Sequence, residues 1–76
     1  MDIKVFIEKF AEQFEETDAN VIKAETVFKE LEEWSSLVAL MVIGMVDEEF
    51  CVTITGEDIR NATTVNDLFN AVKKKL

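Results

Sequence analysis

Residues 35–50 have the sequence SSLVALMVIGMVDEEF, and this stretch decides the fold that the chain predicts. Apolar side chains recur in it at intervals of three and four residues, as they do along one face of an α-helix. The residues of this stripe are Leu37, Leu40, Ile43, Val46 and Phe50. Ser35 is of a type that caps helix N-termini, so we expect a helix over residues 36–50 with the stripe facing inward.

A second apolar stripe lies beside the first and consists of Val38, Met41 and Met45. Three other helices of a 76-residue bundle can hardly cover both stripes, so we expect at least part of the second to be exposed next to Ser36. Methionine is unbranched and adapts to irregular partners, which suits a recognition surface. A wider buried face of the helix is the alternative.

The first half of the chain predicts one helix and a long loop. Residues 2–16 carry apolar side chains at helical spacing: Ile3, Phe6, Ile7, Phe10 and Phe14. Residues 17–35 lack a sustained period, and a loop of this length is often functional. We expect five apolar residues to anchor it to the core: Val21, Ile22, Val27, Phe28 and Leu31.

After the central helix the pattern predicts shorter elements. Residues 51–56 are β-prone but have no partner strand, so we expect an extended connector, followed by one short helical turn over residues 56–60. A last helix should begin after Thr64, with Asp67 completing a capping pair. The expected fold is all-α: a single domain over residues 1–76 with four helices, a long loop between the first two and a short third helix.

Charge and composition limit the partners. Sixteen acidic residues against eight basic ones give a net charge of −8, which repels nucleic acid and favours brief contacts with basic protein surfaces. The single cysteine, Cys51, cannot form an internal disulfide, and the N-terminus lacks the basic start of a signal peptide. The longest uncharged run, residues 34–46, is too short to span a bilayer. We expect a soluble, cytoplasmic protein.

Catalysis by the chain itself is not expected. It has no histidine, and therefore no imidazole base for a nucleophile and no imidazole metal ligand. Cys51 alone makes no zinc site, and the carboxylates of residues 47–49 resemble a solvated helix face. The sequence predicts neither catalytic residues nor a metal site.

Three stretches, FKELEEWSSL at residues 28–37, DEEF at residues 47–50 and ATTV at residues 62–65, carry a likeness that runs without a gap over residues 28–72: the chain resembles the acyl carrier protein family. Residues 28–37, FKELEEWSSL, are similar to the family's segment that ends in the Asp-Ser-Leu attachment motif. Fourteen residues after Ser36, the sequence Asp-Glu-Glu-Phe that ends at Phe50 is similar to the close of the family's second helix. Residues 62–65, ATTV, resemble the entry to the family's fourth helix.

This resemblance implies a four-helix carrier fold in which Ser36 holds a 4′-phosphopantetheine arm donated by coenzyme A. Acyl intermediates would travel on the arm as thioesters in fatty acid, polyketide or related synthesis. The first turn of a helix suits the attachment, because its unbonded N–H groups tolerate a phosphate. The implied partners of this monomeric carrier are a phosphopantetheinyl transferase and acyl-processing enzymes with basic or apolar patches. The residues expected to contact them are Trp34, Ser35, Leu37, Val38 and Met41.

Four positions depart from the family's pattern. Ser35 replaces the usual Asp, which it can match as a helix cap but not as a charge that a transferase reads. Val38 and Met41 replace acidic residues of the recognition face, and Glu32 replaces a glycine.

Other interpretations stay open on the sequence alone. Ser35 and Ser36 can be only a capping pair, in which case the chain is an unmodified, carrier-like acidic module for protein interaction. Trp34 can be a core plug instead of a partner anchor. A helical subunit that dimerises through Val38, Met41 and Met45 is compatible with either interpretation. The acyl group and the pathway are not encoded in any feature of the sequence.

Overall fold

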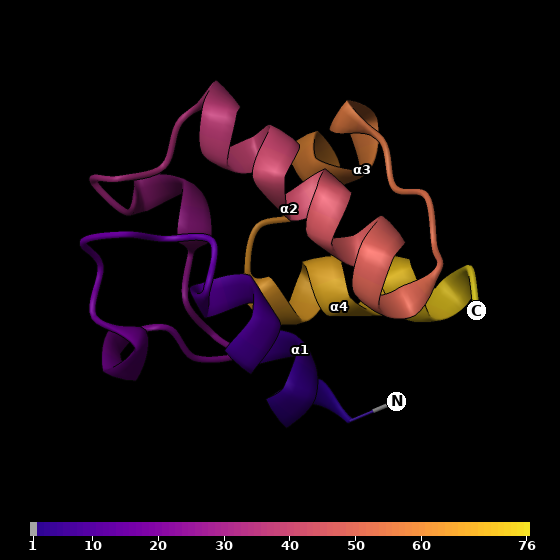
Figure 1. Ribbon diagram of the computed structural model, residues 1–76, viewed down its shortest axis with the longest axis horizontal. Coiled ribbons are helices and arrows are strands. Elements are labelled where there is room, and N and C mark those ends of the chain that lie inside the picture. The colour runs from indigo at the N-terminus through magenta and orange to yellow at the C-terminus, as the bar shows by residue number, and fades with distance from the viewer. Residues whose placement is uncertain (1) are drawn as a thin grey trace.

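Helices form the whole framework of the computed structural model, which describes residues 2–76 (Figure 1). Within these residues there are four α-helices, two single turns of 3-10 helix and no β-strand. In chain order the elements are α1 (Ile3–Ala11), η1 (Ala19–Val21), η2 (Phe28–Glu30), α2 (Ser36–Phe50), α3 (Gly56–Asn61) and α4 (Val65–Lys74). The expected all-α architecture, its long first loop and its short third helix are therefore confirmed.

α1 ends five residues before the predicted boundary at residue 16. Asp2 caps its start, accepting a hydrogen bond from the N–H of Lys4 at 2.9 Å. After Ala11 the turn tightens, and the N–H of Phe14 donates to the carbonyl of Ala11, three residues earlier. The next three N–H groups, of residues 15–17, donate to the carboxylate of Glu33 instead of continuing the helix. A distant side chain thus takes the N–H groups that a helix reaching residue 16 or beyond would need, and no local pattern reveals this.

The loop before α2 is fixed to the core by the apolar residues that the sequence indicated, with one exception. Ile22 and Phe28 are buried, and Val27 and Leu31 are half-buried. Val21 is exposed because η1, which Asp18 caps, holds it on the outside of its turn. The prediction for Val21 was therefore wrong.

The same loop is also hydrogen-bonded to the start of α4. The N–H groups of Val65 and Asn66 donate to the carbonyls of Thr26 and Ala24, at 3.0 and 2.8 Å. The first N–H groups of a helix have no partner within the helix, so the loop satisfies two of them here.

α2 has the predicted bounds and the predicted Ser35 cap, but it is rotated relative to the predicted stripe. Its buried residues are Val38, Val42, Met45 and Val46. Leu37 and Leu40, expected to face inward, are 66% and 64% exposed. Because nearly every side of α2 is apolar, the spacing of its apolar residues does not fix the rotation of the helix about its axis. Packing against the other helices fixes this rotation.

The exposed members of α2 form a patch that we call the α2 apolar patch: Leu37, Leu40 and Met41. Met41 is 37% exposed and Met45 only 6%. Part of the second stripe is thus exposed next to Ser36, as expected, but Val38 and Met45 belong to the core.

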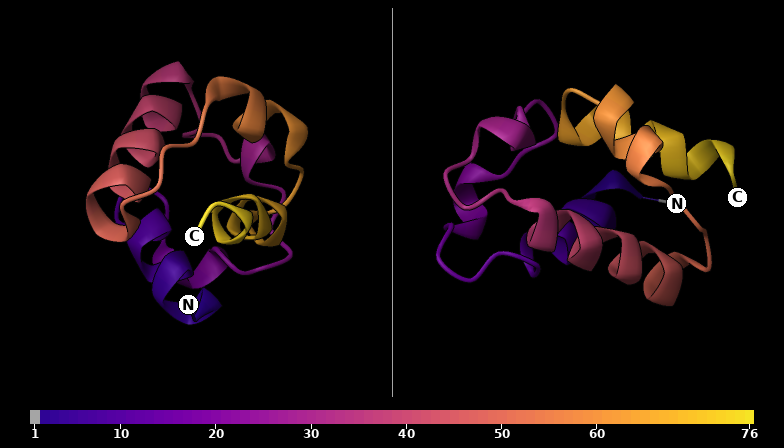
Figure 2. Two further views of the ribbon diagram at one scale, coloured as in Figure 1. Left: turned by 90° about the vertical axis from the view of Figure 1, so that its right-hand side faces the viewer. Right: turned by 90° about the horizontal axis from the view of Figure 1, so that it is seen from above.

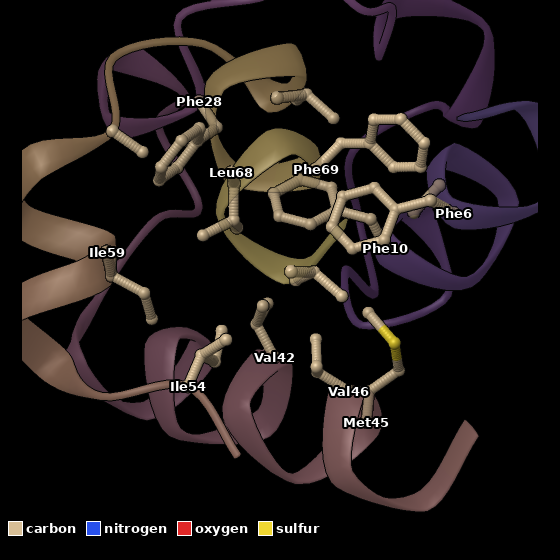
Figure 3. Close-up of a cluster of buried hydrophobic side chains, with 14 of the residues drawn as sticks. Phe6, Phe10, Phe28, Val42, Met45, Val46, Ile54, Ile59, Leu68 and Phe69 are labelled. Atoms are coloured by element: carbon tan, nitrogen blue, oxygen red, sulfur yellow. The ribbon is translucent and has the colours of Figure 1, made fainter. Parts of the chain in front are cut away.

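Aromatic side chains fill the centre between α1, α2 and α4 (Figure 3). The rings of Phe6 and Phe69 lie 5.6 Å apart, and those of Phe10 and Phe28 lie 5.7 Å apart in an edge-on arrangement. Val42 and Val46 approach this cluster from α2 and are fully buried. Large buried rings with branched side chains between them give the close packing that a small domain needs.

The connector and the last two helices follow the prediction. α2 ends at Phe50. Cys51 follows as its C-cap with a left-handed φ of 56°, and the chain then runs extended with Val52 and Ile54 buried. Thr55 and Thr64 cap α3 and α4, each in a reciprocal capping box with an aspartate three residues later. The capping pair of Thr64 and Asp67 is therefore confirmed.

Two methionines of α2 provide a matched test of its rotation. We expect Met41→Glu to change the free energy of unfolding by less than about 0.5 kcal/mol, as surface substitutions usually do. Met45→Glu buries a carboxylate without a partner and should cost several kcal/mol (roughly 2–7). Urea denaturation of both variants measures the difference. Equal losses in the two variants would contradict this rotation of α2.

Candidate functional site

Two adjacent serines at the start of α2 have different roles in the structure. Ser35 is the N-cap: its backbone is extended, and its hydroxyl oxygen accepts a hydrogen bond from the N–H of Val38 at 3.2 Å. Its carbonyl oxygen also accepts from the N–H of Ala39, at 2.9 Å. The Ser35 hydroxyl is therefore engaged in holding the helix start.

Ser36 is the first residue of α2, and it is exposed. Its hydroxyl makes no hydrogen bond to any residue that the structure describes, and the N–H groups of Ser36 and Leu37 are equally unbonded within residues 2–76. Such N–H groups at the positive end of a helix favour a nearby anion. Ser36 thus offers an accessible hydroxyl at a place where an attached phosphate is tolerated.

The carboxylate of Glu33 fixes the chain just before these serines. It accepts four hydrogen bonds: from the N–H of Glu15 at 2.6 Å, that of Glu16 at 3.0 Å, and the N–H and hydroxyl of Thr17, both at 2.8 Å. Partial burial by itself would raise the pKa of Glu33, but these donors outweigh it and lower the pKa below its ordinary value. Glu33 therefore joins the segment after α1 to the segment that leads into Ser36.

Trp34 lies half-buried between the core and the surface. Its ring meets that of Phe28 edge-on at 4.9 Å and stacks near that of Phe10 at 6.5 Å. On its other side it lines a groove open to solvent. The ring thus acts as a core plug, and its role as a partner anchor stays a prediction.

The groove beside Trp34 has a volume of about 460 Å³, and we call it the Ser36 groove. It lies between η2, the first turns of α2, and α3; Figure 2 shows η2 beside α3. Its lining residues are Lys29, Trp34, Ser35, Ser36, Ala39, Gly56, Ile59 and Arg60.

Lys29 and Arg60 were not among the predicted site residues. The ammonium of Lys29 donates to the carbonyl of Arg60 at 2.7 Å, which ties η2 to the end of α3. The two residues are 31 positions apart in the sequence, so only the packing of α3 brings them to Ser36. The one signal in the sequence was the rarity of basic residues in this acidic chain.

The predicted contact residues divide into two groups. Trp34, Ser35, Leu37 and Met41 present surface around Ser36, and the α2 apolar patch follows directly from Ser36 along the helix. Val38 is 6% exposed and packs in the core, so its side chain is not available to a partner. Leu37 and Val38 are adjacent in the first turn of α2, where Leu37 is exposed and Val38 is buried.

Residues 2–76 contain no group of three His, Cys, Asp or Glu side chains arranged to hold a metal ion. In the same residues, no helix has the length and apolar character needed to cross a membrane.

Comparisons of this chain with protein-family models, curated proteins and solved structures give no match.

The Glu33 contacts predict that the chain segment before Ser36 is stabilised in a pH-dependent way. Glu33→Gln removes the charge that the four donors share, so we expect a lower melting temperature at pH 7 and faster amide exchange at residues 15–17. Because the pKa is lowered in the folded state, this contribution is complete above the ordinary glutamate pKa of about 4.3 and is lost as the pH falls through the lower folded value.

The matched control is Glu32→Gln, because Glu32 is exposed and makes no hydrogen bond or ion pair with residues 2–76. It should leave both measurements unchanged. The difference in melting temperature between the wild type and Glu33→Gln should shrink as the pH is lowered from 7 to below 4. Equal melting temperatures of these two proteins at pH 7 would refute the role of Glu33.

Proposed function

We propose that this chain is an acyl carrier protein, which carries acyl groups as thioesters on a 4′-phosphopantetheine arm attached to Ser36. The observation that carries the proposal is the division of roles between the two serines. Ser35 uses its hydroxyl to cap α2, whereas the hydroxyl of Ser36 is exposed and unbonded within residues 2–76. A pair of serines that served only as caps would not require the second hydroxyl to stand free.

The attachment chemistry asks little of the carrier. The Ser36 oxygen would attack the phosphorus of coenzyme A that bears the pantetheine, forming an O–P bond. The bond between the two phosphates breaks, the adenosine bisphosphate half leaves with the electron pair, and a base of the transferase takes the serine proton. The chain supplies access to the hydroxyl and unbonded N–H groups near the new phosphodiester.

The positions that carry the resemblance to the family fall at element boundaries, which supports the finer, carrier-like description of the fold. Ser36 begins α2, Phe50 ends it, and Thr64 caps α4. The long loop before α2 and the six-residue α3 complete the expected order. Spacing that coincides with structural boundaries is harder to obtain by chance than a Ser-Leu pair.

The surface around Ser36 supports partners of a particular kind. The net charge of −8 favours enzymes with basic surfaces, and the α2 apolar patch adds an uncharged area in which Met41 stands where the family usually has an acidic residue. A transferase or acyl-processing enzyme that combines an apolar centre with basic surroundings fits both features. Trp34, Ser35, Leu37 and Met41 are the residues that we expect it to contact.

A second candidate is an unmodified carrier-like module that only binds other proteins. The α2 apolar patch favours it, because Leu37 and Leu40 are exposed large side chains of the type that mark binding surfaces. The two candidates share fold and charge, and they differ in whether Ser36 is modified. Intact mass after co-expression with an active transferase separates them.

We expect incubation with coenzyme A and a broad-specificity transferase to add one arm to the wild type and none to Ser36→Ala. The control is Ser35→Asn, which retains a good helix cap but has no hydroxyl at that position, and it should still be modified. Intact mass and fragmentation of the modified peptide give the site. An arm on Ser36→Ala, or its loss only in a folded Ser35→Asn, would place the attachment elsewhere.

Restoring the family's acidic residue should affect the rate of modification and little else. We expect Ser35→Asp to be modified faster by a transferase that prefers acidic carriers, because the side chain before the attachment serine regains its charge. Asp and Ser cap helices about equally well, so stability should change by only a few tenths of a kcal/mol. Single-turnover rates of both proteins measure the effect, and an equal or lower rate in Ser35→Asp would show that this position is not recognised.

A further inference from the structure

The Ser36 groove has a charge opposite to that of the chain as a whole. Carboxylates outnumber basic residues by sixteen to eight, yet the two charged residues that line the groove are Lys29 and Arg60. Another groove of similar volume, about 440 Å³, lies beside the Glu33 contacts, and its charged residues are all glutamates. The Ser36 groove is thus a local cationic site on an acidic protein.

Neither cation forms an ion pair with a carboxylate of residues 2–76. The ion pairs of this part of the chain join Lys9 to Glu12 and Glu49, and Lys75 to Asp58. Lys29 and Arg60 are therefore available to an anion from outside the described chain.

The environment of Lys29 holds its charge at the groove. Its ammonium donates to the carbonyl of Arg60 at 2.7 Å and lies 5.7 Å from the centre of the Phe28 ring. An ammonium has three N–H donors, so this hydrogen bond leaves two for a ligand. The guanidinium of Arg60 has a planar fork of donors that matches two oxygens of a phosphate.

Apolar side chains form another part of the lining. Trp34 presents one side of its half-buried ring, and Ile59 comes from α3. A ligand that fits both features has a phosphate at one end and an uncharged, partly apolar chain attached to it. Ser36 lies on the same groove, so a phosphate bonded to its hydroxyl would begin there.

We propose that Lys29 and Arg60 bind the phosphodiester on Ser36 and that the first part of the attached arm lies along the groove against Trp34 and Ile59. This inference rests on the proposed function, because it requires the arm. The two cations offset the repulsion that a net charge of −8 exerts on a phosphate. The arm is then held against the protein and is not simply in solvent.

The test compares the unmodified and the modified protein by NMR, using the indole N–H of Trp34 and the methyl groups of Ile59. In the wild type both sets of signals shift when the arm is added. The shifts are largely lost in the double variant Lys29→Gln/Arg60→Gln, and they become smaller in high salt, which screens the phosphate contacts. The double variant Lys29→Arg/Arg60→Lys retains both charges and retains the shifts.

The matched control is Lys4→Gln/Lys23→Gln, which makes the same change in net charge at exposed lysines outside the groove. It should behave as the wild type does. Modified wild type whose Trp34 and Ile59 signals do not move, or a control that loses the shifts as fully as the groove variant, would overturn the proposal while leaving the proposed function intact.

Free 4′-phosphopantetheine, titrated into Ser36→Ala, separates the two proposals further. In one outcome no transferase adds an arm, but the free compound shifts the Trp34 and Ile59 signals of Ser36→Ala. If these shifts are absent from the variant that also carries Lys29→Gln/Arg60→Gln, the groove binds this ligand and the proposed function fails. If there is no attachment and the signals do not shift at millimolar concentrations, both proposals are overturned.

Discussion

The burial of one face of α2 against the aromatic cluster governs the arrangement of the site. Val42 and Val46 are completely buried, and Val38 and Met45 nearly so, which fixes the rotation of the helix about its axis. That rotation places Leu37, Leu40 and Met41 on the surface and leaves Ser36 exposed at the helix start. A helix with apolar residues on most sides has several rotations of similar hydrophobic content, and close packing selects one of them.

Polar contacts then fix the chain on either side of the buried face. The Ser35 hydroxyl caps α2, and Glu33, two residues earlier, collects donors from the segment after α1. A carboxylate with several hydrogen-bond donors is most effective when ionised, which agrees with its lowered pKa. The same contacts hold the segment after α1 against the segment that leads into Ser36.

Charge is distributed unevenly over this frame. Acidic residues outnumber basic ones two to one in the chain, whereas Lys29 and Arg60 meet at the Ser36 groove and the α2 apolar patch has no charge. A partner that approaches Ser36 therefore meets an acidic surface at long range and an apolar and cationic area at close range. Long-range charge mainly affects the rate of encounter, and close contacts decide what remains bound.

Ser36 became the candidate attachment residue through the resemblance to acyl carrier proteins. The sequence by itself determined the elements: the bounds of α2, the Ser35 cap, and the capping pair of Thr64 and Asp67. These depend on spacing and on hydrogen bonds between near neighbours, which a linear pattern contains. Tertiary structure alone decided which group binds the N–H groups after α1, the exposure of Leu37 and Leu40 in place of Val38, and the meeting of Lys29 with Arg60. Each of these results from contacts between residues many positions apart, and spacing along the chain does not specify which distant groups meet.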